Sequence, residues 1–378
     1  MEKKRVLFTA TVVKQHIMTF HTPYLRMFQE MGWETAVASS NDYENPGDLN
    51  IPNCDTYYEI PFERMPWKAG NIRAYRALKK IIEEGSFDII HCHTPVGGLV
   101  TRLAAAGARK KGTKVLYTAH GFHFHKGSSL VSWLAYYPVE WLMAHLTDIL
   151  LTMNQEDFAL AQKKMHAKRV LYIPGVGIDT RKFVNHRDDR AEKRQELGFG
   201  EDDFLILTVA EMNKNKNQSM VLKALSRMKD SPEFEKIKYL ICGMGEYGQV
   251  LAQEAKDLGI EDHVFFMGYR KDIPAMHRCC DLFAFMSYRE GLPVALMEAM
   301  SSGMSVVCSG ARGNTDLVED GKEGRILEND PQILAEAILQ LYHDPQLRHQ
   351  YGMAAAEKVK QFDRENVHRI MKDIYLSV

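Results

Sequence analysis

The stretch that decides the fold lies between residues 5 and 40, where RVLFTATVV (5–13) is followed by PYLRMFQEMG (23–32) and ETAVASS (34–40). The first and third segments have the pattern of buried strands, and the second has the apolar spacing of a helix. A strand, a helix and another strand in this order form a βαβ unit. The stretch therefore predicts a mostly parallel sheet with helices on its faces.

The same alternation continues along the chain. The first half contains three more strand-like runs: FDIIHCH (87–93), KVLYTAH (114–120) and DILLTMN (148–154). A polar, charged interval, NHRDDRAEKRQELGFGEDD (185–203), interrupts the pattern. It then restarts in the second half with five runs: FLILTVAE (204–211), KYLICGMG (238–245), HVFFMGY (263–269), CDLFAFMS (280–287) and SVVCSGA (305–311).

The length of 378 residues exceeds the usual size of a single hydrophobic core. We therefore predict an α/β protein of two doubly wound, Rossmann-like domains, with a ligand between them at the carboxyl ends of the strands. We expect an N-terminal domain over residues 1–180 and a C-terminal domain over residues 181–360. Residues 361–378 should form a last helix that packs back on the N-terminal domain.

Composition narrows the class of protein further. The chain has 48 basic and 49 acidic residues and a net charge of −1, which gives no reason to expect a nucleic-acid partner. The six cysteines lack metal-ligand spacing and predict thiols in a reducing cytoplasm. MEKKRVLFTATVV (1–13) has no long apolar run or cleavage site, so it predicts a strand and not a signal peptide.

The most lipid-like segment runs from Leu130 to Leu151 and is interrupted by Pro138, Glu140 and Asp148. These three residues exclude a clean membrane span. The aromatic and leucine content instead predicts a helix pair, either packed in the domain or resting on a membrane surface.

The most informative local motif is EGLPVALMEAM (290–300), which places two carboxylates around a helix start. Gly291 frees the backbone, and Pro293 suits the first helical position. The start of such a helix offers N–H groups and a positive dipole end to an anion. Glu290 and Glu298 would lie up to ~12 Å apart along the axis. A phosphate at the helix end with hydroxyls on both sides predicts a nucleotide sugar.

A second pattern, GMGEYG (243–248), follows a strand-like run and has the GxGxxG spacing of dinucleotide sites. Such a site would also need an acidic residue about 20 positions further on. The next strand ends instead in Gly268, Tyr269 and Arg270. We therefore favour a tight turn with close helix packing over a nicotinamide site, and we expect no cofactor apart from a nucleotide-sugar substrate.

Four segments of the second half resemble, in this order, the donor domain of retaining glycosyltransferases of family 4, which have the GT-B fold of two domains facing each other across a cleft. These segments are VAEMNKNKN (209–217), GMGEYGQVLAQEAKDLGIEDHVFFMGYRKDIP (243–274), CDLFAFMSYREGLPVALMEAMSSGMSVVCS (280–309) and GNTDLVEDGKEGRIL (313–327). Glu290 and Glu298 match the paired glutamates of that family. Three segments of the first half resemble the branch serving bacterial capsule, exopolysaccharide and O-antigen assembly: HIMTFHTPYLRMF (16–28), HTPVGGLVTRLAAAGARKKG (93–112) and YTAHGFHFHKG (117–127).

By position, the resemblance implies roles for several donor-side residues. Glu298 would hold the ribose hydroxyls of the nucleotide, and Glu290 the hydroxyls of the donor sugar near the reacting carbon. The backbone amides of Gly291 and Leu292 would help to bind the diphosphate. Lys216 would neutralise the diphosphate as it leaves, which is the electrostatic help this chemistry needs most.

The resemblance also covers the rest of the expected site. His120, at the end of KVLYTAH, matches the histidine that reaches the donor from the N-terminal side of the cleft. Tyr269 and Arg270 lie at positions where residues of the family surround the base of the donor nucleotide. His120, His123 and His125 have a spacing that could hold a metal, but they lack the carboxylate or cysteine company of zinc patterns, so we predict no metal.

Two departures from the family pattern concern the phosphate and the acceptor. Many members have an arginine where this chain has Glu211, and a carboxylate would repel phosphate. Either Lys214 or Lys216 then carries the charge alone, or Glu211 points elsewhere and contacts the acceptor. The glycine-rich loop after the first strand is also missing, which leaves His16 and His21 as candidate acceptor contacts.

These observations predict a cytoplasmic, metal-independent, retaining glycosyltransferase, specifically a hexosyl- or N-acetylhexosaminyltransferase. Its donor would be a nucleotide diphosphate sugar, in the first place a UDP-sugar. Its acceptor would be a lipid-diphosphate-linked sugar or a saccharide in cell-surface polysaccharide synthesis. WLAYY (133–137) and GARKK (107–111) favour peripheral contact with the inner face of the membrane.

Two alternatives stay open at the level of sequence. The first is a nucleotide-sugar 2-epimerase of similar fold, which would need further acid and base carboxylates in the cleft. The second is a non-catalytic partner subunit that binds the nucleotide sugar, which Glu211 favours.

Overall fold

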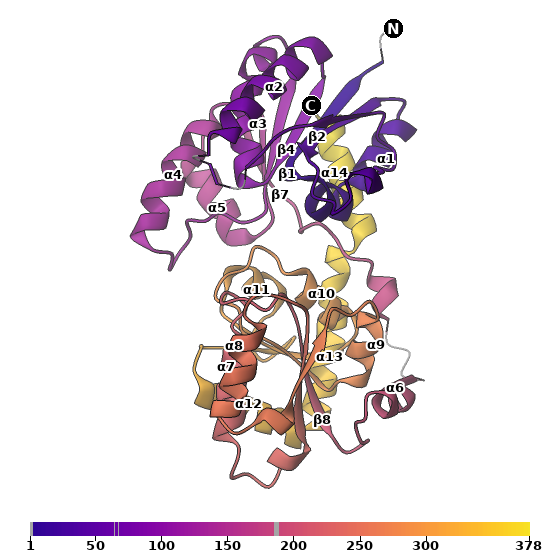
Figure 1. Ribbon diagram of the computed structural model, residues 1–378, viewed down its shortest axis with the longest axis vertical. Coiled ribbons are helices and arrows are strands. Elements are labelled where there is room, and N and C mark those ends of the chain that lie inside the picture. Colours follow the sequence, from indigo (N-terminus) through magenta and orange to yellow (C-terminus); the bar gives the residue numbers. More distant parts are fainter. Residues whose placement is uncertain (1–2, 64, 67, 185–188) are drawn as a thin grey trace. The chain divides into compact units, whose positions relative to one another are not determined.

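The chain folds into two compact units, each a parallel sheet with helices on its faces (Figure 1). The computed structural model describes residues 3–63, 65–66, 68–184 and 189–378. The first unit consists of Met1–Val176 with His368–Val378, and the second of Gly177–Val367. The predicted class of two doubly wound, Rossmann-like α/β domains is confirmed. The first residues of the predicted polar interval, 185–188, lie outside the described residues.

The sheet of the first unit has seven strands in the order β3-β2-β1-β4-β5-β6-β7. Its strands are β1 (Arg5–Val12), β2 (Glu34–Ser40), β3 (Thr56–Glu59), β4 (Ile89–His93), β5 (Lys114–Ala119), β6 (Ile149–Thr152) and β7 (Arg169–Tyr172). Its helices are η1 (Val13–Met18), α1 (Thr22–Glu30), η2 (Pro46–Asp48), α2 (Gly70–Gly85), α3 (Pro95–Lys110), α4 (Leu130–Ala144) and α5 (Gln155–Lys164). All the strands predicted in this half are present.

The last helix of the chain, α14 (Arg364–Leu376), contributes its final residues to the first unit. Figure 1 shows its yellow ribbon alongside the indigo and purple elements of that unit. The hydroxyl of Tyr375 lies 2.6 Å from Nδ1 of His91, a buried residue of β4. The end of the chain is therefore tied to the middle of the first sheet by a buried hydrogen bond.

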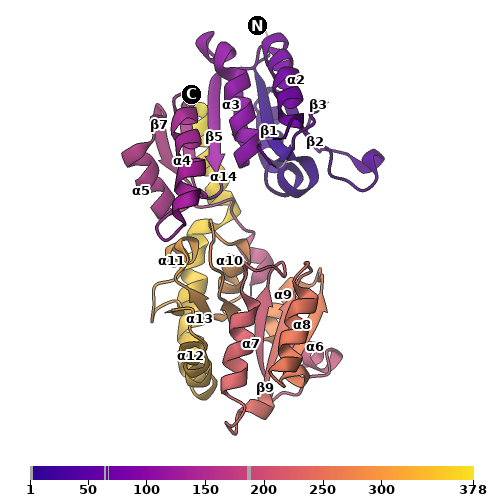
Figure 2. The same ribbon diagram turned by 60° about the vertical axis from the view of Figure 1, so that its left-hand side comes forward.

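The segment from Leu130 to Leu151 is one helix, α4, followed by strand β6, so the predicted helix pair is wrong. Pro138 lies inside α4 without ending it. Figure 2 shows α4 beside α5, and Nζ of Lys164 in α5 lies 5.7 Å from the ring centroid of Trp133 in α4. Within the part of the chain that the structure describes, no helix is long and apolar enough to cross a membrane.

The sheet of the second unit has six strands in the order β10-β9-β8-β11-β12-β13. Its strands are β8 (Phe204–Val209), β9 (Ile237–Cys242), β10 (Val264–Gly268), β11 (Leu282–Phe285), β12 (Ser305–Ser309) and β13 (Arg325–Leu327). Its helices, besides the start of α14, are η3 (Thr180–Phe183), α6 (Arg190–Glu196), α7 (Gln218–Arg227), η5 (Phe234–Lys236), α8 (Gly248–Asp257), η6 (Glu261–His263), α9 (Ile273–Cys279), α10 (Val294–Ser301), α11 (Arg312–Leu317), α12 (Pro331–His343), α13 (Pro345–Val359) and η7 (Lys360–Phe362). All five predicted strands of this half are present.

Each sheet contains one point where the strand order reverses. In the first unit this switch point lies between β1 and β4, and in the second it lies between β8 and β11. The connections on the two sides of such a point run to opposite faces of the sheet, which opens a crevice at the carboxyl ends of the strands. The topology therefore marks one candidate ligand site in each unit.

Candidate active site

The loops after β8 and β11 bring Lys216 and Glu290 together at the switch point of the second unit. Nζ of Lys216 lies 2.7 Å from Oε1 of Glu290, and the side chains are 22% and 9% exposed. The same Nζ lies 5.0 Å from the ring centroid of Phe285 at the end of β11. A cation and a carboxylate that the sequence singled out from distant segments are thus in direct contact, in a partly dehydrated setting that strengthens their electrostatic interactions.

Two asparagines hold the loop after β8 (210–217, the lysine loop) against the loop after β11 (286–293, the glutamate loop). Nδ2 of Asn215 donates to the backbone carbonyl of Arg289 at 2.9 Å. The backbone carbonyl of Asn215 accepts from the N–H of Tyr288 at 2.9 Å. Nδ2 of Asn217 donates to the carbonyl of Met286 at 3.0 Å. Asn217 has a left-handed backbone with φ of 53°, which asparagine tolerates better than most residues. The pattern NKNKN thereby fixes the position of Lys216.

Helix α10 begins at Val294, one residue later than the sequence indicated. Pro293 is its N-cap, with an extended ψ of 117°, and its carbonyl accepts a hydrogen bond from the N–H of Met297 at 3.2 Å. Gly291 and Leu292 therefore lie in the turn before the helix. The N–H groups of the first turn have no partner within an α-helix and favour an anion.

Arg312 and Gly313, at the start of α11, support the backbone of the glutamate loop. The buried Arg312 donates from Nε to the carbonyl of Glu290 at 3.0 Å. A Cβ on Gly313 would lie 2.3 Å from the carbonyl oxygen of Gly291, so only glycine permits this approach. Sequence reasoning missed Arg312. The available signal was an arginine next to Gly313, shortly after the strand that ends at Ser309 and at the same sheet edge as Glu290.

Glu298 lies within α10 and is half-buried. Burial raises the pKa of its carboxyl to about 7, although the positive charges of Lys182 and Arg364 act in the opposite direction. A carboxyl with this pKa changes its charge near neutral pH. It can accept two hydrogen bonds from ligand hydroxyls when ionised and donate one when protonated.

The structure places the remaining sequence-predicted residues of this unit around the same sheet edge. Tyr269 follows β10 and is 73% exposed. Arg270 is held by Asp272, with Nε donating to Oδ1 at 2.7 Å. Glu211 is exposed and accepts a hydrogen bond from Nδ2 of Asn213 at 3.0 Å, within its own loop. Lys214 is also exposed, so it is Lys216 that pairs with Glu290.

Two of the three glycines of GMGEYG, Gly243 and Gly245, are required by close backbone packing. A Cβ on Gly243 would lie 1.9 Å from the carbonyl oxygen of Ala210, and one on Gly245 would lie 2.2 Å from that of Met212. The N–H of Gly243 also donates to the carbonyl of Gly268 at 2.8 Å. The turn therefore lies directly against the start of the lysine loop, as expected for a packing turn.

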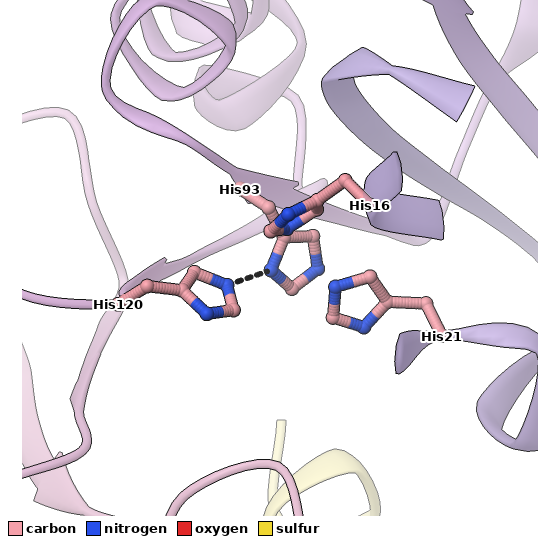
Figure 3. A group of neighbouring side chains, drawn as sticks. All are labelled: His16, His21, His93 and His120. Atoms are coloured by element: carbon pink, nitrogen blue, oxygen red, sulfur yellow. Dashed lines mark hydrogen bonds between the residues drawn. The ribbon is translucent and has the colours of Figure 1, made fainter. Parts of the chain in front are cut away.

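The switch point of the first unit gathers four histidines, each of which offers one ring nitrogen, and these four atoms all lie within 4.8 Å of one another. Figure 3 shows the rings converging from η1, the N-cap of α1, the end of β4 and the residue after β5. Nε2 of His120 lies 3.4 Å from Nδ1 of His93. We call this group the histidine cluster: His16, His21, His93 and His120.

The histidine cluster is neutral near pH 7. Burial lowers the pKa of His16 to about 4. Burial also lowers the pKa values of His21, His93 and His120 well below their ordinary value, and neighbouring histidines lower them further. The grouping of His120 with His123 and His125 that the sequence suggested does not form, because the His123 ring stacks on Tyr136 at 4.6 Å and Nδ1 of His125 bonds the Lys126 carbonyl at 2.9 Å.

A cavity of about 580 Å³ lies beside the histidine cluster in the first unit. Its walls are mostly apolar, and His16 belongs to both the cavity and the cluster. Representative lining residues are Thr11, His16, Leu99, Phe122, Tyr136 and Glu140. Helix α4 lines this cavity with Tyr136 and Glu140, and it also carries Leu130, Val131 and Leu134, which are 75–80% exposed.

Comparison with known proteins matches a family model to each of the two units. Residues 5–153 match the family described as "Glycosyl transferase 4-like", and residues 189–358 match "Glycosyl transferases group 1". The chain is 38% identical over 376 residues to the "Putative glycosyltransferase EpsD" of Bacillus subtilis (strain 168), covering 98% of this chain and 96% of the relative.

A second relative and a solved structure extend the comparison. The chain is 26% identical over 313 residues to the UDP-Gal:alpha-D-GlcNAc-diphosphoundecaprenol alpha-1,3-galactosyltransferase of Escherichia coli, covering 82% of this chain and 80% of the relative. The crystal structure of HepE from Anabaena in complex with UDP has a TM-score of 0.80 and 22% identity over all of both chains, a likeness of fold. The chain therefore belongs to the glycosyltransferases that combine a 4-like domain with a group 1 domain, and it has the GT-B fold.

Proposed function

We propose that this protein is a retaining glycosyltransferase that moves a sugar from a UDP-sugar to a hydroxyl of a lipid-linked or saccharide acceptor in cell-surface polysaccharide synthesis. The observation that carries the proposal is the ion pair of Lys216 and Glu290 beside the start of α10. A cation and a helix N-terminus suit a diphosphate, and a carboxylate suits sugar hydroxyls.

The donor is bound by an exchange of partners. Lys216 leaves Glu290 for the diphosphate, and the freed carboxylate accepts hydrogen bonds from hydroxyls of the donor sugar. The backbone amides of Gly291 and Leu292 add further donors to the diphosphate. Glu298 accepts from the ribose hydroxyls, and the exposed ring of Tyr269 with Arg270 frames the base.

Transfer breaks the bond between the anomeric carbon and the diphosphate oxygen and forms a bond from the acceptor oxygen on the same face of the sugar. The acceptor proton passes to the departing phosphate oxygen. Negative charge grows on the diphosphate during this step, and Lys216 stabilises it without a metal ion. His120 contributes to the same step from the first unit, by contact with the donor.

A lipid-diphosphate-linked sugar is the favoured acceptor. The apolar cavity beside His16 has a size suited to part of a lipid chain or a sugar. The exposed leucines of α4 suit peripheral contact with the cytoplasmic face of the inner membrane. The name of the Escherichia coli relative specifies a diphosphoundecaprenol-linked acceptor, which supports this choice.

The test is a screen of nucleotide sugars for thermal stabilisation of the purified protein, followed by transfer to lipid-linked acceptors in membrane vesicles. We expect one UDP-sugar to stabilise the protein and to be transferred, with the anomeric configuration of the product retained as measured by NMR. An inverted product would contradict retention. Conversion of the donor without any acceptor would identify an epimerase, and donor binding without turnover would identify a non-catalytic partner.

A further inference from the structure

The histidine cluster has the composition and spacing of a metal centre, although the sequence predicted none. We propose that it binds one divalent transition-metal ion of the class of Zn²⁺, Co²⁺ or Ni²⁺. Zn–N bonds of about 2.0–2.1 Å place two ligand nitrogens of a tetrahedral site roughly 3.4 Å apart. Nδ1 of His93 and Nε2 of His120 lie 3.4 Å apart, so this pair already has the spacing of two ligands to one ion.

Three rings of the cluster surround a common point. Imidazole rings that each direct a nitrogen at one tetrahedral zinc ion have centroids roughly 5 Å apart. The centroid of His16 lies 4.6 Å from that of His120 and 5.6 Å from that of His93, and the last two lie 5.6 Å apart. These three histidines can therefore bind one ion with small changes of side-chain angle.

His21 decides whether the site has three or four histidine ligands. Its ring stacks on that of His93, with centroids 3.7 Å apart and planes at 25°, so the two lone pairs do not converge as placed. A rotation of the His21 ring supplies a fourth ligand. Without it, the site keeps three histidines and an open fourth position, an arrangement that zinc also accepts.

The cluster also contains buried nitrogen atoms that need a partner. Among the residues that the structure describes, Nε2 of His16, Nε2 of His93 and both ring nitrogens of His21 have no hydrogen-bond partner. His21 and His93 are 3% and 1% exposed. Unsatisfied buried polar atoms are rare and destabilising, and an unseen ion or water is a common explanation. With Nδ1 of His93 and Nε2 of His120 as ligands, an ion in the cluster would also engage Nε2 of His16 and one nitrogen of His21.

The chemistry of the ligands selects the class of metal. The cluster offers imidazole nitrogens, which bind metals in their neutral form. Neutral imidazole suits Zn²⁺, Ni²⁺ and Cu²⁺, whereas Mg²⁺ and Ca²⁺ prefer oxygen ligands, which the cluster does not supply. The neighbouring His91 is no candidate, because its nitrogens bond Tyr375 at 2.6 Å and Thr118 at 2.8 Å.

The test is a titration of chelator-stripped, full-length protein without an affinity tag with Co²⁺, followed by visible spectroscopy. We expect one equivalent of Co²⁺ to produce the intense absorption of a four- or five-coordinate centre, and one equivalent of Zn²⁺ to abolish it. Octahedral Co²⁺, which absorbs weakly, or the absence of saturable binding would overturn the proposal.

Variants assign the metal to the cluster. His93→Gln should weaken Co²⁺ affinity at least tenfold, whereas His166→Gln, which alters an exposed histidine of the same unit, should leave affinity within twofold. Circular dichroism checks that each variant folds. If His93→Gln is unfolded, His16→Gln replaces it, because His16 is only half-buried. Equal affinities in the wild type and the cluster variant would overturn the assignment.

Discussion

The two switch points of this protein have the same strand topology but differ in charge: one carries an ion pair and the other carries neutral rings. In the second unit a cation and a carboxylate, Lys216 and Glu290, form an ion pair on loops after β8 and β11. In the first unit the histidine cluster presents neutral rings at the ends of β4 and β5 and on the elements after β1. The fold therefore supplies the crevice, and the side chains decide whether it suits a diphosphate or a ligand that seeks nitrogen lone pairs.

The supports of the two sites differ as well. The charged pair lies on loops that asparagine side chains and Arg312 fasten to one another. The histidine cluster lies on strand ends and on the π-helical turn η1, an irregular element that is frequent at functional sites. Loops can exchange partners with little cost, whereas strand ends hold a fixed arrangement. We expect substitutions in the two units to affect function in different ways.

The largest effect should come from Lys216→Ala. Loss of the cation that stabilises the departing diphosphate should lower kcat by roughly 10²–10³-fold, the range found for single groups that stabilise developing negative charge. The matched control is Lys214→Ala, which removes an exposed lysine two residues away and should change kcat less than about twofold. Steady-state kinetics on the transferred sugar measures both. Similar losses in the two variants would mean that the loop is needed only for folding or general charge.

A smaller loss should follow from His120→Ala. We expect kcat/KM for the donor to fall roughly 10–100-fold, because one contact to the donor is lost but the charged pair is intact. His125→Ala, on the same loop and bonded to the Lys126 carbonyl, is the control and should retain wild-type kinetics. Wild-type kinetics in His120→Ala would contradict the proposed contact between His120 and the donor.

The next effect concerns pH and Glu298. Its raised pKa of about 7 means that it is protonated below neutral pH and ionised above it. Because the ionised form accepts hydrogen bonds from ribose, donor KM should fall as pH rises from 6 to 8. Glu298→Gln should have a KM about tenfold higher than the wild type at pH 8 and independent of pH. A pH-dependent KM in this variant would assign the titration to another group.

The contribution of Glu298 to the stability of the folded protein depends on pH in the opposite direction: it decreases as pH rises. Its pKa is higher in the folded protein than the ordinary value of 4.5, so its contribution to folding is complete below pH 4.5 and is lost as pH rises through about 7. Because the ionised carboxylate binds ribose more strongly, added UDP should raise the melting temperature more at pH 8 than at pH 6.

The smallest effect on activity near neutral pH should come from acid destabilisation of the first unit, which develops only as pH falls. Burial lowers the pKa values of His16 to about 4 and of His91 to about 3, below the ordinary value of 6.5. Their contribution to stability is present above pH 6.5 and is lost as pH falls toward 4, at about 1.4 kcal/mol per pH unit for each histidine. Hydrogen exchange, corrected for intrinsic rates, should show β1 and β4 losing protection before β8 and β11. Equal loss in both sheets would contradict this difference.

Local patterns predicted the fold because the periodicity of a strand or a helix can be detected within a short segment of sequence. The run RVLFTATVV and the five runs of the second half are strands where the sequence placed them. The short strands β3, β7 and β13 were missed, since segments of three or four residues have little periodicity to detect. The lipid-like segment at 130–151 was misread as two helices, because the apolar strand β6 follows α4 after only four residues.

The candidate sites were predictable to different degrees. Lys216 and Glu290 came from family motifs, and their contact follows from the parallel pairing of β8 with β11. The histidine cluster could not be assembled from spacing, because His16 and His93 are brought together only by the pairing of β1 with β4. The run FDIIHCH predicted a strand, and its last histidine went unremarked. A histidine at the carboxyl end of a central strand was the available signal.

The most direct test of the central claim is calorimetric titration of UDP into the wild type, Lys216→Ala and Lys214→Ala. If the second switch point binds the diphosphate through Lys216, the wild type and Lys214→Ala will bind UDP with affinities within about twofold, and Lys216→Ala will bind at least tenfold more weakly. Equal UDP affinity in all three proteins, or no UDP binding by the wild type, would contradict the account.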